Sequence, residues 1–449
     1  MFRRDSYNYL RQWKGSSDRK PLIIRGARQV GKTTLVKMFS QEFETFIDLN
    51  LERKRDWEVF EKYDTAEEII GDLLFRKNKP MVVKEGDNIL LFIDEIQYSP
   101  KAVGMLRYFY EDTPNVHVIA AGSLLENMLS SQTISFPVGR VVYMALHPCS
   151  FTEFLRASGY EDLTYSLIEM ELSKPAHSTL MQMFNEYTLI GGMPAVVSSY
   201  IEHRDLGLLG EIYESLIGSY QGDAEKYAKN ETSQKVLRHI LNTGWQYAGE
   251  RIKLANFGES NYRSREVGEA FTALQKAFLL ELVYPANDMR LPIHSDLKKS
   301  PKLFWLDVGL VNYKSDIQME IFGAKDIADA FRGKVAEQIV WQELSSASHS
   351  ILSEQHFWVR EARNSQAEID FLFRYNGLLI PIEVKSGHTA KLKSLHLFME
   401  TAPVDFAIRF WNNLPQEDKI QLPSGKEYTL FNLPYYYAGH LKKFLDKTL

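Results

Sequence analysis

Short apolar segments alternate with longer amphipathic ones over the first third of the chain. Five apolar runs have the length of buried strands: residues 21–24, 45–50, 89–93, 116–121 and 141–146. Between them, residues 33–43 and 101–112 repeat apolar side chains at helical spacing, and the charged residues 52–80 are also expected to be helical. Strands that are apolar throughout are typical of parallel sheets with helices on both faces. The pattern predicts an α/β fold with a parallel sheet for residues 1–160.

The middle of the chain has the pattern of two helices followed by a strand. Residues 233–247 and 264–276 place apolar side chains at helical spacing, and residues 278–284 are a largely apolar run. Helix, turn, helix and strand is the order of a winged helix-turn-helix, which we expect within residues 226–310. Residues 301–310 predict a strand and turn with a structural role.

Alternating apolar and polar positions return in the last part of the chain. An amphipathic helix is expected from residue 336, and strands over residues 356–360, 368–373 and 378–385. The last two strands are close enough to form a hairpin. We therefore predict a second α/β unit over residues 325–449.

Composition narrows the class of protein further. The 449 residues imply roughly two to four domains. A net charge of −5 provides no overall basic field, so contact with nucleic acid requires a local patch. The single cysteine, Cys149, excludes an intrachain disulfide and a thiolate metal cluster. The chain has neither a signal-peptide pattern nor an apolar run long enough to span a membrane, so we expect a cytoplasmic protein.

The sharpest motif lies between the first apolar run and the first predicted helix. Eight consecutive residues fit the phosphate-loop pattern G-x-x-x-x-G-K-[ST]: Gly26, Ala27, Arg28, Gln29, Val30, Gly31, Lys32 and Thr33. In such a loop, backbone N–H groups and the helix N-terminus face the phosphates, and we add the next residue, Thr34, to the binding set. Lys32 would reach the β- and γ-phosphates and Thr33 would bind Mg²⁺. A glycine-rich turn that fits by chance is the alternative, and the strand and helix on either side argue against it.

The third apolar run ends in two acids, Asp94 and Glu95, which is the Walker B pattern. Asp94 would hold Mg²⁺ directly or through water, and Glu95 would orient and deprotonate the attacking water. The alternative is a buried strand that ends in surface acids. The alternation of strands and helices between Lys32 and Asp94 favours the catalytic interpretation.

Two further positions are candidates for sensing the nucleotide. Ser123 follows the fourth apolar run, where a hydroxyl would contact the γ-phosphate or the catalytic water, and an N-cap for the next helix is an equal alternative. Arg140 precedes the fifth strand, where ring-forming ATPases present an arginine finger to the neighbouring subunit. The alternative is an ordinary surface arginine or a salt-bridge partner. A finger would imply a homo-oligomer.

Six motifs in order carry a resemblance to a known family. They are GARQVGKTTL from Gly26, LLFIDEIQ from Leu90, GS from Gly122, GRV from Gly139, HPCSFTEF from His147 and GGMP from Gly191. This order resembles a bacterial and archaeal family of AAA-type ATPases with a C-terminal domain of unknown function, over essentially the whole chain. The resemblance implies an ATP-binding core and a helical lid, expected over residues 161–225. No sensor-2 arginine is evident near residues 191–194. No N-K-x-D motif for guanine is present, so ATP is the expected nucleotide.

Acidic residues gather on the last two predicted strands. Asp370 lies on the first strand, and Glu383 and Lys385 are two apart on the second, so these two project from the same face. The arrangement resembles the PD-(D/E)xK core of restriction endonucleases. Asp370 and Glu383 would hold Mg²⁺, and Lys385 would position a hydroxide or stabilise charge on the reacting phosphate. Glu337, on the preceding helix, matches the additional metal-binding acid of that family.

The alternative is a hairpin with polar residues on its solvent face. It does not explain why Glu368, Asp370 and Glu383 would crowd together without a cation. Two functions stay open for this unit. One is an ATP-regulated nuclease acting on DNA or RNA, which the intact motif favours. The other is a nucleotide-driven switch or scaffold that binds a partner without cleaving it, which the acidic overall charge favours.

The winged-helix segment is a second possible contact for DNA or RNA. Its second helix offers Arg263, Arg265 and Lys276 to a phosphate backbone, but Glu266 and Glu269 lie on the same stretch. Protein packing is the alternative use of such a segment. We expect no membrane partner.

Overall fold

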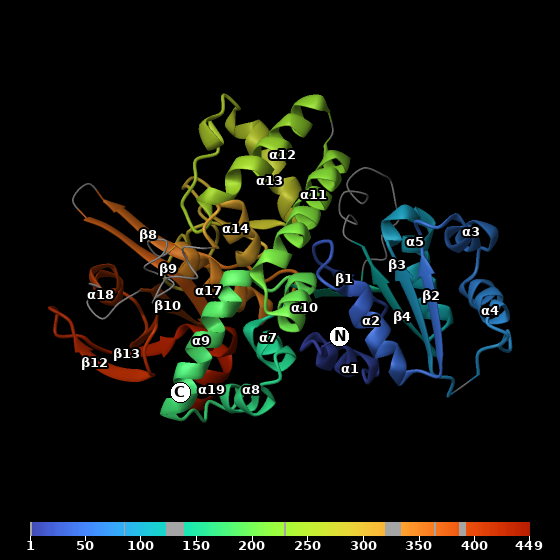
Figure 1. Ribbon diagram of the computed structural model, residues 1–449, viewed down its shortest axis with the longest axis horizontal. Coiled ribbons are helices and arrows are strands. Elements are labelled where there is room, and N and C mark those ends of the chain that lie inside the picture. The colour runs from blue at the N-terminus through green and yellow to red at the C-terminus, as the bar shows by residue number, and fades with distance from the viewer. Residues whose placement is uncertain are drawn as a thin grey trace.

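The computed structural model describes residues 2–84, 86–122, 139–228, 230–318, 334–362, 365–385 and 392–449. Figure 1 shows an N-terminal sheet (blue) and a C-terminal sheet (orange and red) on opposite sides of the molecule. Long helices lie between them, including α9 (Lys174–Ile190) and α11 (Leu209–Tyr227).

The N-terminal sheet is parallel throughout, in the strand order β2-β3-β4-β1-β5. Its strands lie at the five predicted apolar runs: β1 (Leu22–Arg25), β2 (Thr45–Asn50), β3 (Ile89–Asp94), β4 (Val116–Ala121) and β5 (Val142–Ala145). Leu22 and Ile24 of β1 belong to one core, and Ile23 belongs to the other, because strand side chains alternate between faces. Two helices cover the first face: α1 (Ser6–Lys14) and α2 (Lys32–Phe39). Three cover the second: α3 (Lys54–Lys62), α4 (Ala66–Arg76) and α5 (Pro100–Asp112). The predicted parallel α/β sheet is confirmed.

Helices dominate the middle of the chain. After β5 come α7 (Phe151–Ala157), α8 (Glu161–Ile168), α9, α10 (Pro194–His203) and α11. Next, α12 (Glu231–Thr243) and α13 (Ser264–Lys276) pack against each other ahead of an antiparallel pair, β6 (Leu280–Val283) and β7 (Lys302–Trp305). The second helix of this segment has the predicted bounds, and the first ends earlier than predicted and continues as a 3-10 turn. The turn predicted after β7 is the short helix α14 (Val308–Lys314).

The C-terminal sheet is mixed, in the order β12-β13-β11-β10-β9-β8. Its strands are β8 (His356–Ala362), β9 (Ser365–Tyr375), β10 (Leu378–Val384), β11 (Phe406–Trp411), β12 (Gln416–Gln421) and β13 (Glu427–Pro434). β10 pairs antiparallel with β9 and parallel with β11, which is itself parallel to β13. One face packs on α17 (Lys334–Ser346) and the tyrosine-rich turn Tyr435–His440, and the other on α18 (Lys393–Met399). The last helix is α19 (Leu441–Thr448).

One hydrophobic cluster runs through all of these parts. It includes Leu22 in the N-terminal sheet, Tyr187 in α9, Phe271 in α13 and Ile382 in the C-terminal sheet. The two sheets are therefore joined by buried side chains rather than by a solvated linker. None of the described helices is both long and apolar enough to cross a membrane.

Candidate functional site

The glycine-rich loop connects β1 to α2 at the carboxyl end of the parallel strands. Gly31, the N-cap of α2, has a φ of 96°, which favours glycine. A Cβ at Gly26 would overlap the backbone oxygen of Leu146, so this position also requires glycine. The predicted binding residues Ala27 to Val30 lie between the two glycines, and Lys32 to Thr34 begin the helix. The helix N-terminus is thereby presented as an anion site.

The two predicted Mg²⁺ ligands are in contact. The Thr33 hydroxyl donates a hydrogen bond of 2.6 Å to the Asp94 carboxylate at the end of β3. Lys32 Nζ donates to the backbone oxygens of Gly26 (2.9 Å) and Ala27 (2.8 Å). Burial raises the pKa of Asp94 and lowers the pKa of Lys32 to about 8. A hydroxyl beside a carboxylate is an oxygen donor set suited to Mg²⁺.

Glu95 is adjacent to this pair. Its φ of 54° is left-handed, and its carboxylate accepts a hydrogen bond of 2.5 Å from Gln97 Nε2. Burial raises the pKa of Glu95, which suits a proton acceptor. A Cβ at Gly122 would overlap the Gln97 amide oxygen, so Gln97 lies between Glu95 and the end of β4. Ser123, the predicted sensor, lies outside the described residues.

Arg140 lies at the amino ends of the parallel strands, opposite the ends that carry the glycine-rich loop. It precedes β5, which is parallel to β1, so it is far from the carboxyl ends where the glycine-rich loop lies. Its Nε donates to Glu111 at 2.8 Å and its guanidinium lies over the Tyr110 ring. Arg140 therefore takes no part in the nucleotide site of its own chain. A role toward a neighbouring subunit stays a prediction.

Helix α11, within the segment expected to form a lid, contacts the glycine-rich loop directly. Arg28 Nη1 lies 3.0 Å from the Asp223 carboxylate, and the Tyr220 hydroxyl donates to the Arg28 backbone oxygen at 3.2 Å. Asp223 is buried although it is charged. Sequence reasoning missed this contact, because one acid on an amphipathic helix carries no distinguishing pattern.

A buried polar network, which we call the junction cluster, joins distant parts of the chain. Its members are Tyr187, Gly192, Asp307, Gln342 and Glu343. Asp307 accepts from the Gly192 N–H at 2.6 Å, and Glu343 accepts from the Tyr187 hydroxyl at 2.8 Å. Gln342 donates to both Tyr187 (3.1 Å) and Asp307 (3.4 Å). Burial raises the pKa of Asp307 to about 6 and that of Glu343 to about 7.

The junction cluster continues to the glycine-rich loop through Arg4. Its guanidinium donates to the Val30 backbone oxygen at 3.0 Å and to the Glu153 carboxylate at 2.8 Å. Glu153 belongs to α7, and the N–H of Phe151 in the same helix donates to Glu343 of α17 at 3.0 Å. Asp307 lies in residues 301–310, for which the sequence predicts a structural role, and its carboxylate is the acceptor at the centre of this network.

Four acids converge in the C-terminal unit as the carboxylate cluster, which consists of Glu337, Glu368, Asp370 and Glu383. An unpredicted residue, Lys302 of β7, lies among them. Its ammonium is 2.7 Å from Glu368, 2.8 Å from Glu337 and 3.4 Å from Asp370, and the residue is 2% exposed. Burial acts to lower the pKa of Lys302, but the carboxylates outweigh it and raise that pKa. The cation that the crowded acids were expected to need is therefore an ammonium of the same chain.

Lys385 lies on the other side of the cluster. Its Nζ is 2.9 Å from Glu383 and 3.9 Å from Asp370, as expected for strand neighbours projecting from one face. Burial raises the pKa of Glu383 to about 8 and that of Glu337 to about 7. Within the described ranges, no group of three or more His, Cys, Asp or Glu side chains has the arrangement of a metal site. The predicted ligands Glu337, Asp370 and Glu383 are thus brought together around lysines, and their metal binding stays a prediction.

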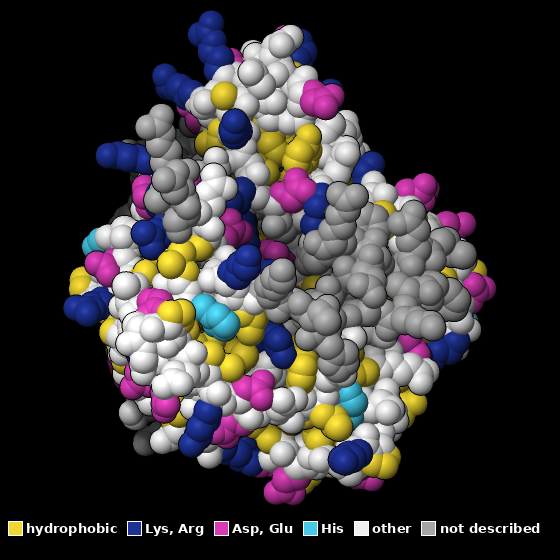
Figure 2. All heavy atoms as spheres, turned by 90° about the vertical axis from the view of Figure 1, so that its left-hand side faces the viewer, with side chains coloured by type: hydrophobic (Ala, Val, Ile, Leu, Met, Phe, Trp, Pro, Cys, Tyr) yellow, Lys and Arg dark blue, Asp and Glu magenta, His cyan; other side chains and the backbone are white. Residues whose placement is uncertain are grey.

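The surface that carries this unit has charges of both signs. Figure 2 shows a hollow near the middle of this face, with Lys or Arg and Asp or Glu side chains close together around it. On α13, Arg265 is bonded to Glu269 of the same helix at 3.0 Å, and the backbone N–H of Arg263, the N-cap, donates to Glu266. Of the basic side chains of the predicted winged helix, that of Arg265 is therefore offset by an acid one turn away.

The parallel sheet, the glycine-rich loop and the acid-ended strand β3 are the features of a P-loop nucleotide-binding domain. Residues 18–155 match a family model described as an AAA domain. Residues 181–320 and 332–421 match two models described as domains of unknown function (DUF8612 and DUF4143). The AAA match supports an ATPase, and the other two leave the C-terminal activity open.

Three proteins that match most of this chain do not identify its activity. An uncharacterized protein of Haemophilus influenzae is 24% identical over 391 residues, covering 84% of this chain and 85% of its own. A Walker-type ATPase of Pyrococcus abyssi is 17% identical with a TM-score of 0.44, covering 70% of this chain and 96% of its own. The RuvB Holliday junction branch migration motor of Thermotoga maritima is 17% identical with a TM-score of 0.27, covering 66% and 93%. At such TM-scores these likenesses do not bear on function.

Proposed function

We propose that this protein binds and hydrolyses MgATP and that its nucleotide state controls the C-terminal unit. Lys32 and the loop N–H groups bind the phosphates, Thr33 and Asp94 hold Mg²⁺, and Glu95 activates the attacking water. The observation that carries the proposal is the 2.6 Å contact between Thr33 and Asp94 beside the loop lysine. A cytoplasmic location fits the single cysteine, Cys149, whose thiol is free and buried.

The C-terminal unit is proposed to be a PD-(D/E)xK-like domain that cleaves DNA or RNA. A winged helix formed by α12, α13, β6 and β7 is proposed as a second contact with the nucleic acid. Asp370, Glu383 and Lys385 on adjacent strands support it. Glu337 and the two strand acids would hold Mg²⁺, which would activate the attacking water. Arg140 is proposed as a finger toward a neighbouring subunit, and Ser123 as the sensor of the γ-phosphate.

One observation favours a second function, that of a switch or scaffold whose C-terminal unit binds a partner without cleaving it. The Lys302 ammonium already lies within hydrogen-bond distance of three members of the carboxylate cluster. A divalent cation that displaced this buried ammonium would break its ion pairs, and that loss costs free energy. In this second function the cluster is a structural ion network.

The test combines two assays on the full chain. ATP hydrolysis is measured for wild type, Lys32→Ala and Glu95→Gln, and both variants should lose at least about a hundredfold in rate. Cleavage of plasmid and single-stranded DNA and of RNA with Mg²⁺ or Mn²⁺, with and without ATP, is compared with Asp370→Ala. Cleavage that disappears in Asp370→Ala supports the nuclease. ATP hydrolysis without cleavage under any condition rejects the nuclease and leaves the switch.

A further inference from the structure

The strand beside the carboxylate cluster carries a buried arginine. Arg409 of β11 pairs in register with Glu383 of β10. Partners in adjacent strands lie about 4.8 Å apart, and side chains at the same register project from the same face. Arg409 therefore lies one strand from the nuclease-like motif, on the same side of the sheet as Glu383.

Several buried polar atoms on this face make no hydrogen bond within the described part of the chain. They are Glu383 Oε2, Arg409 Nε, the Tyr428 hydroxyl and Asn432 Oδ1. Asn432 pairs in register with Arg409 on the other side, and Tyr428 lies on the same strand, β13. Native proteins satisfy nearly all buried polar atoms. Of the four residues, Arg409 also lines a cavity, so its Nε is a donor that a polar ligand there can use.

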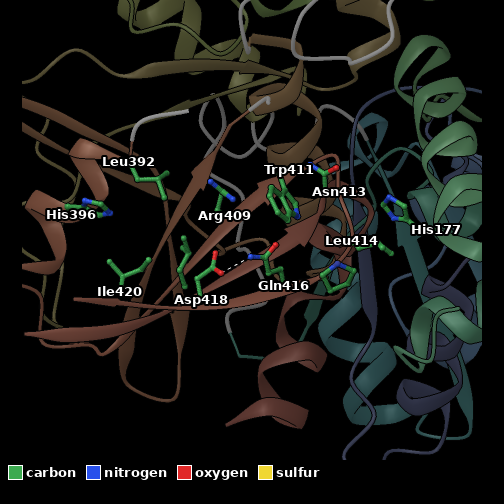
Figure 3. Close-up of a pocket in the computed structure, with 12 residues that line it drawn as sticks. His177, Leu392, His396, Arg409, Trp411, Asn413, Leu414, Gln416, Asp418 and Ile420 are labelled. Carbon is green, nitrogen blue, oxygen red and sulfur yellow. Dashed lines mark hydrogen bonds between the residues drawn. The ribbon is translucent and has the colours of Figure 1, made fainter. Parts of the chain in front are cut away.

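A cavity of about 810 Å³ opens over this part of the sheet. Figure 3 shows Arg409 and Trp411 on the strand, with His396 of α18 and His177 of α9 on opposite sides. The Arg409 guanidinium lies 4.5 Å from the centre of the Trp411 ring, which fixes its orientation. Arg409 itself is 7% exposed.

The charge and shape of the cavity restrict the kinds of ligand that can bind in it. Burial lowers the pKa of both His177 and His396, so both rings are neutral at pH 7 and Arg409 is the cation of the cavity. Asp418 is the acid among the described lining residues, and its carboxylate accepts from Gln416 (2.6 Å) and Asn432 (2.8 Å). The amides of Asn413 and Gln416 also line the cavity, and the remaining walls are apolar side chains: Leu392, Leu414, Pro415, Ile420 and Leu430. One fixed cation with imidazole, amide and apolar walls matches a phosphate linked to a flat base.

We propose that this cavity, the Arg409 cavity, binds a nucleotide unit of a single-stranded nucleic acid, with Arg409 on a phosphate next to the one at Lys385. The inference rests on the proposed function, because the same nucleic-acid substrate would run from Lys385 at the end of β10 to Arg409 on β11. The volume is within the range of about 300–1,000 Å³ for small-ligand sites, which has room for a nucleotide. A base can enter such a cavity only after leaving its pairing partner, so a duplex must first open.

The proposal is tested by anisotropy of a labelled oligothymidylate and of the matching duplex, without divalent metal, in about 50–200 mM salt. Arg409→Met should weaken single-strand binding roughly tenfold and lower the slope of log K against log salt by about 0.7. Lys419→Met is the matched control, because it removes a charge from β12 on a residue next to Asp418 that projects from the opposite face. It should bind like wild type. Arg409→Lys keeps the charge without the planar fork, so it should bind with intermediate affinity and an unchanged slope.

Each outcome has a separate meaning. If wild type binds the single strand and Arg409→Met binds equally well with an unchanged melting temperature, the Arg409 cavity is wrong and the proposed function stands. If wild type hydrolyses ATP but binds neither form at the lowest salt, the cavity and the nuclease are both rejected. If a polyglutamate peptide displaces the oligonucleotide from wild type at equal concentration of charge, the occupant is an acidic peptide and the nucleic-acid assignment is overturned.

Discussion

Three carboxylates of the carboxylate cluster lie within hydrogen-bond distance of one ammonium. Lys302 comes from β7, and its partners come from α17 and β9, so the ion network joins elements that are distant in sequence. Removing one member of a buried ion network leaves the others without a counter-charge, which typically costs about 3–5 kcal/mol. The lysine is thus as important to this site as the acids that the motif contains.

Lys302→Met should lower the melting temperature strongly, because Glu337, Glu368 and Asp370 then repel one another. Mn²⁺ or Ca²⁺ should restore part of the loss by replacing the ammonium, and should have little effect on wild type. The measurement is thermal unfolding with and without each cation. Lys298→Met, an exposed lysine of the preceding loop, is the control and should change nothing. A Lys302→Met protein as stable as wild type would contradict the role of this lysine.

Glu343 predicts a dependence of stability on pH. Burial raises its pKa to about 7, compared with about 4.3 in an unfolded chain. The folded state therefore holds the proton more tightly, and its free energy of unfolding falls as pH rises from about 4.3 to about 7 by roughly 1.4 kcal/mol per pKa unit. Glu343→Gln keeps the acceptor for Tyr187 and removes the titration.

The melting temperature of Glu343→Gln should fall less than that of wild type between acidic and neutral pH. Glu67→Gln, an exposed change on α4, should leave the wild-type pH profile intact. Equal profiles for all three proteins would show that Glu343 does not titrate in this window.

The sequence predicted the positions of those side chains of the candidate nucleotide site that follow a local pattern. Gly26 to Thr33 and Asp94 lie as expected because apolar strands and a glycine-rich turn specify a parallel sheet locally. Lys302, Asp223 and Asp307 could not be predicted. Each acts through a partner far away in the chain, and a lone charged residue beside apolar neighbours is equally typical of the surface. The need for a counter-charge was foreseen, but Lys302 was not, since it comes from another segment, and Mg²⁺ binding by these acids stays a prediction.

At the scale of elements, the end of α9 at Ile190 and Gly191 packs closely against α14. A Cβ at Gly309, in α14, would overlap the backbone oxygen of Ile190, the last residue of α9. Gly309→Ala should therefore force α14 and α9 apart and cost about 1–3 kcal/mol, as overpacked cores do. Chemical unfolding measures it. Gly218→Ala on α11, where an added Cβ meets no atom within 4 Å, should be neutral or stabilising.

The contact between helix α11 and the glycine-rich loop predicts an effect on nucleotide affinity. Asp223 holds Arg28 and adds a negative charge near the loop that binds phosphates. Asp223→Asn should strengthen MgATP binding a few-fold, since it removes a like charge worth about 1 kcal/mol at this range. Binding of a fluorescent ATP analogue reports the change. Glu211→Ala, an exposed acid on the same helix, should bind as wild type does.

At the scale of the whole molecule, hydrogen bonds run from the glycine-rich loop through Arg4, Glu153 and the junction cluster to α17. α17 also carries Glu337 of the carboxylate cluster. A shift of the loop on nucleotide binding can therefore bias α17 without a mobile linker, provided that the two nucleotide states differ in these contacts.

Hydrogen exchange tests this coupling. ATP should change the protection of residues 302–314 and 334–346 in Glu95→Gln, which binds ATP without hydrolysing it. Lys32→Ala should show no change, because it does not bind the phosphates. Protection changes confined to the N-terminal sheet in Glu95→Gln would mean that the two sheets act independently.

The origin of Lys302 has a practical consequence for dissecting the protein. A fragment that begins at residue 325 has every acid of the motif and Lys385 but lacks Lys302, and it also loses the buried partners of α17 in the shared core. Such a fragment would misfold or bind stray cations, and its inactivity or activity would say little about the intact protein. The C-terminal unit should be expressed alone or exchanged between relatives only together with the β6–β7 pair.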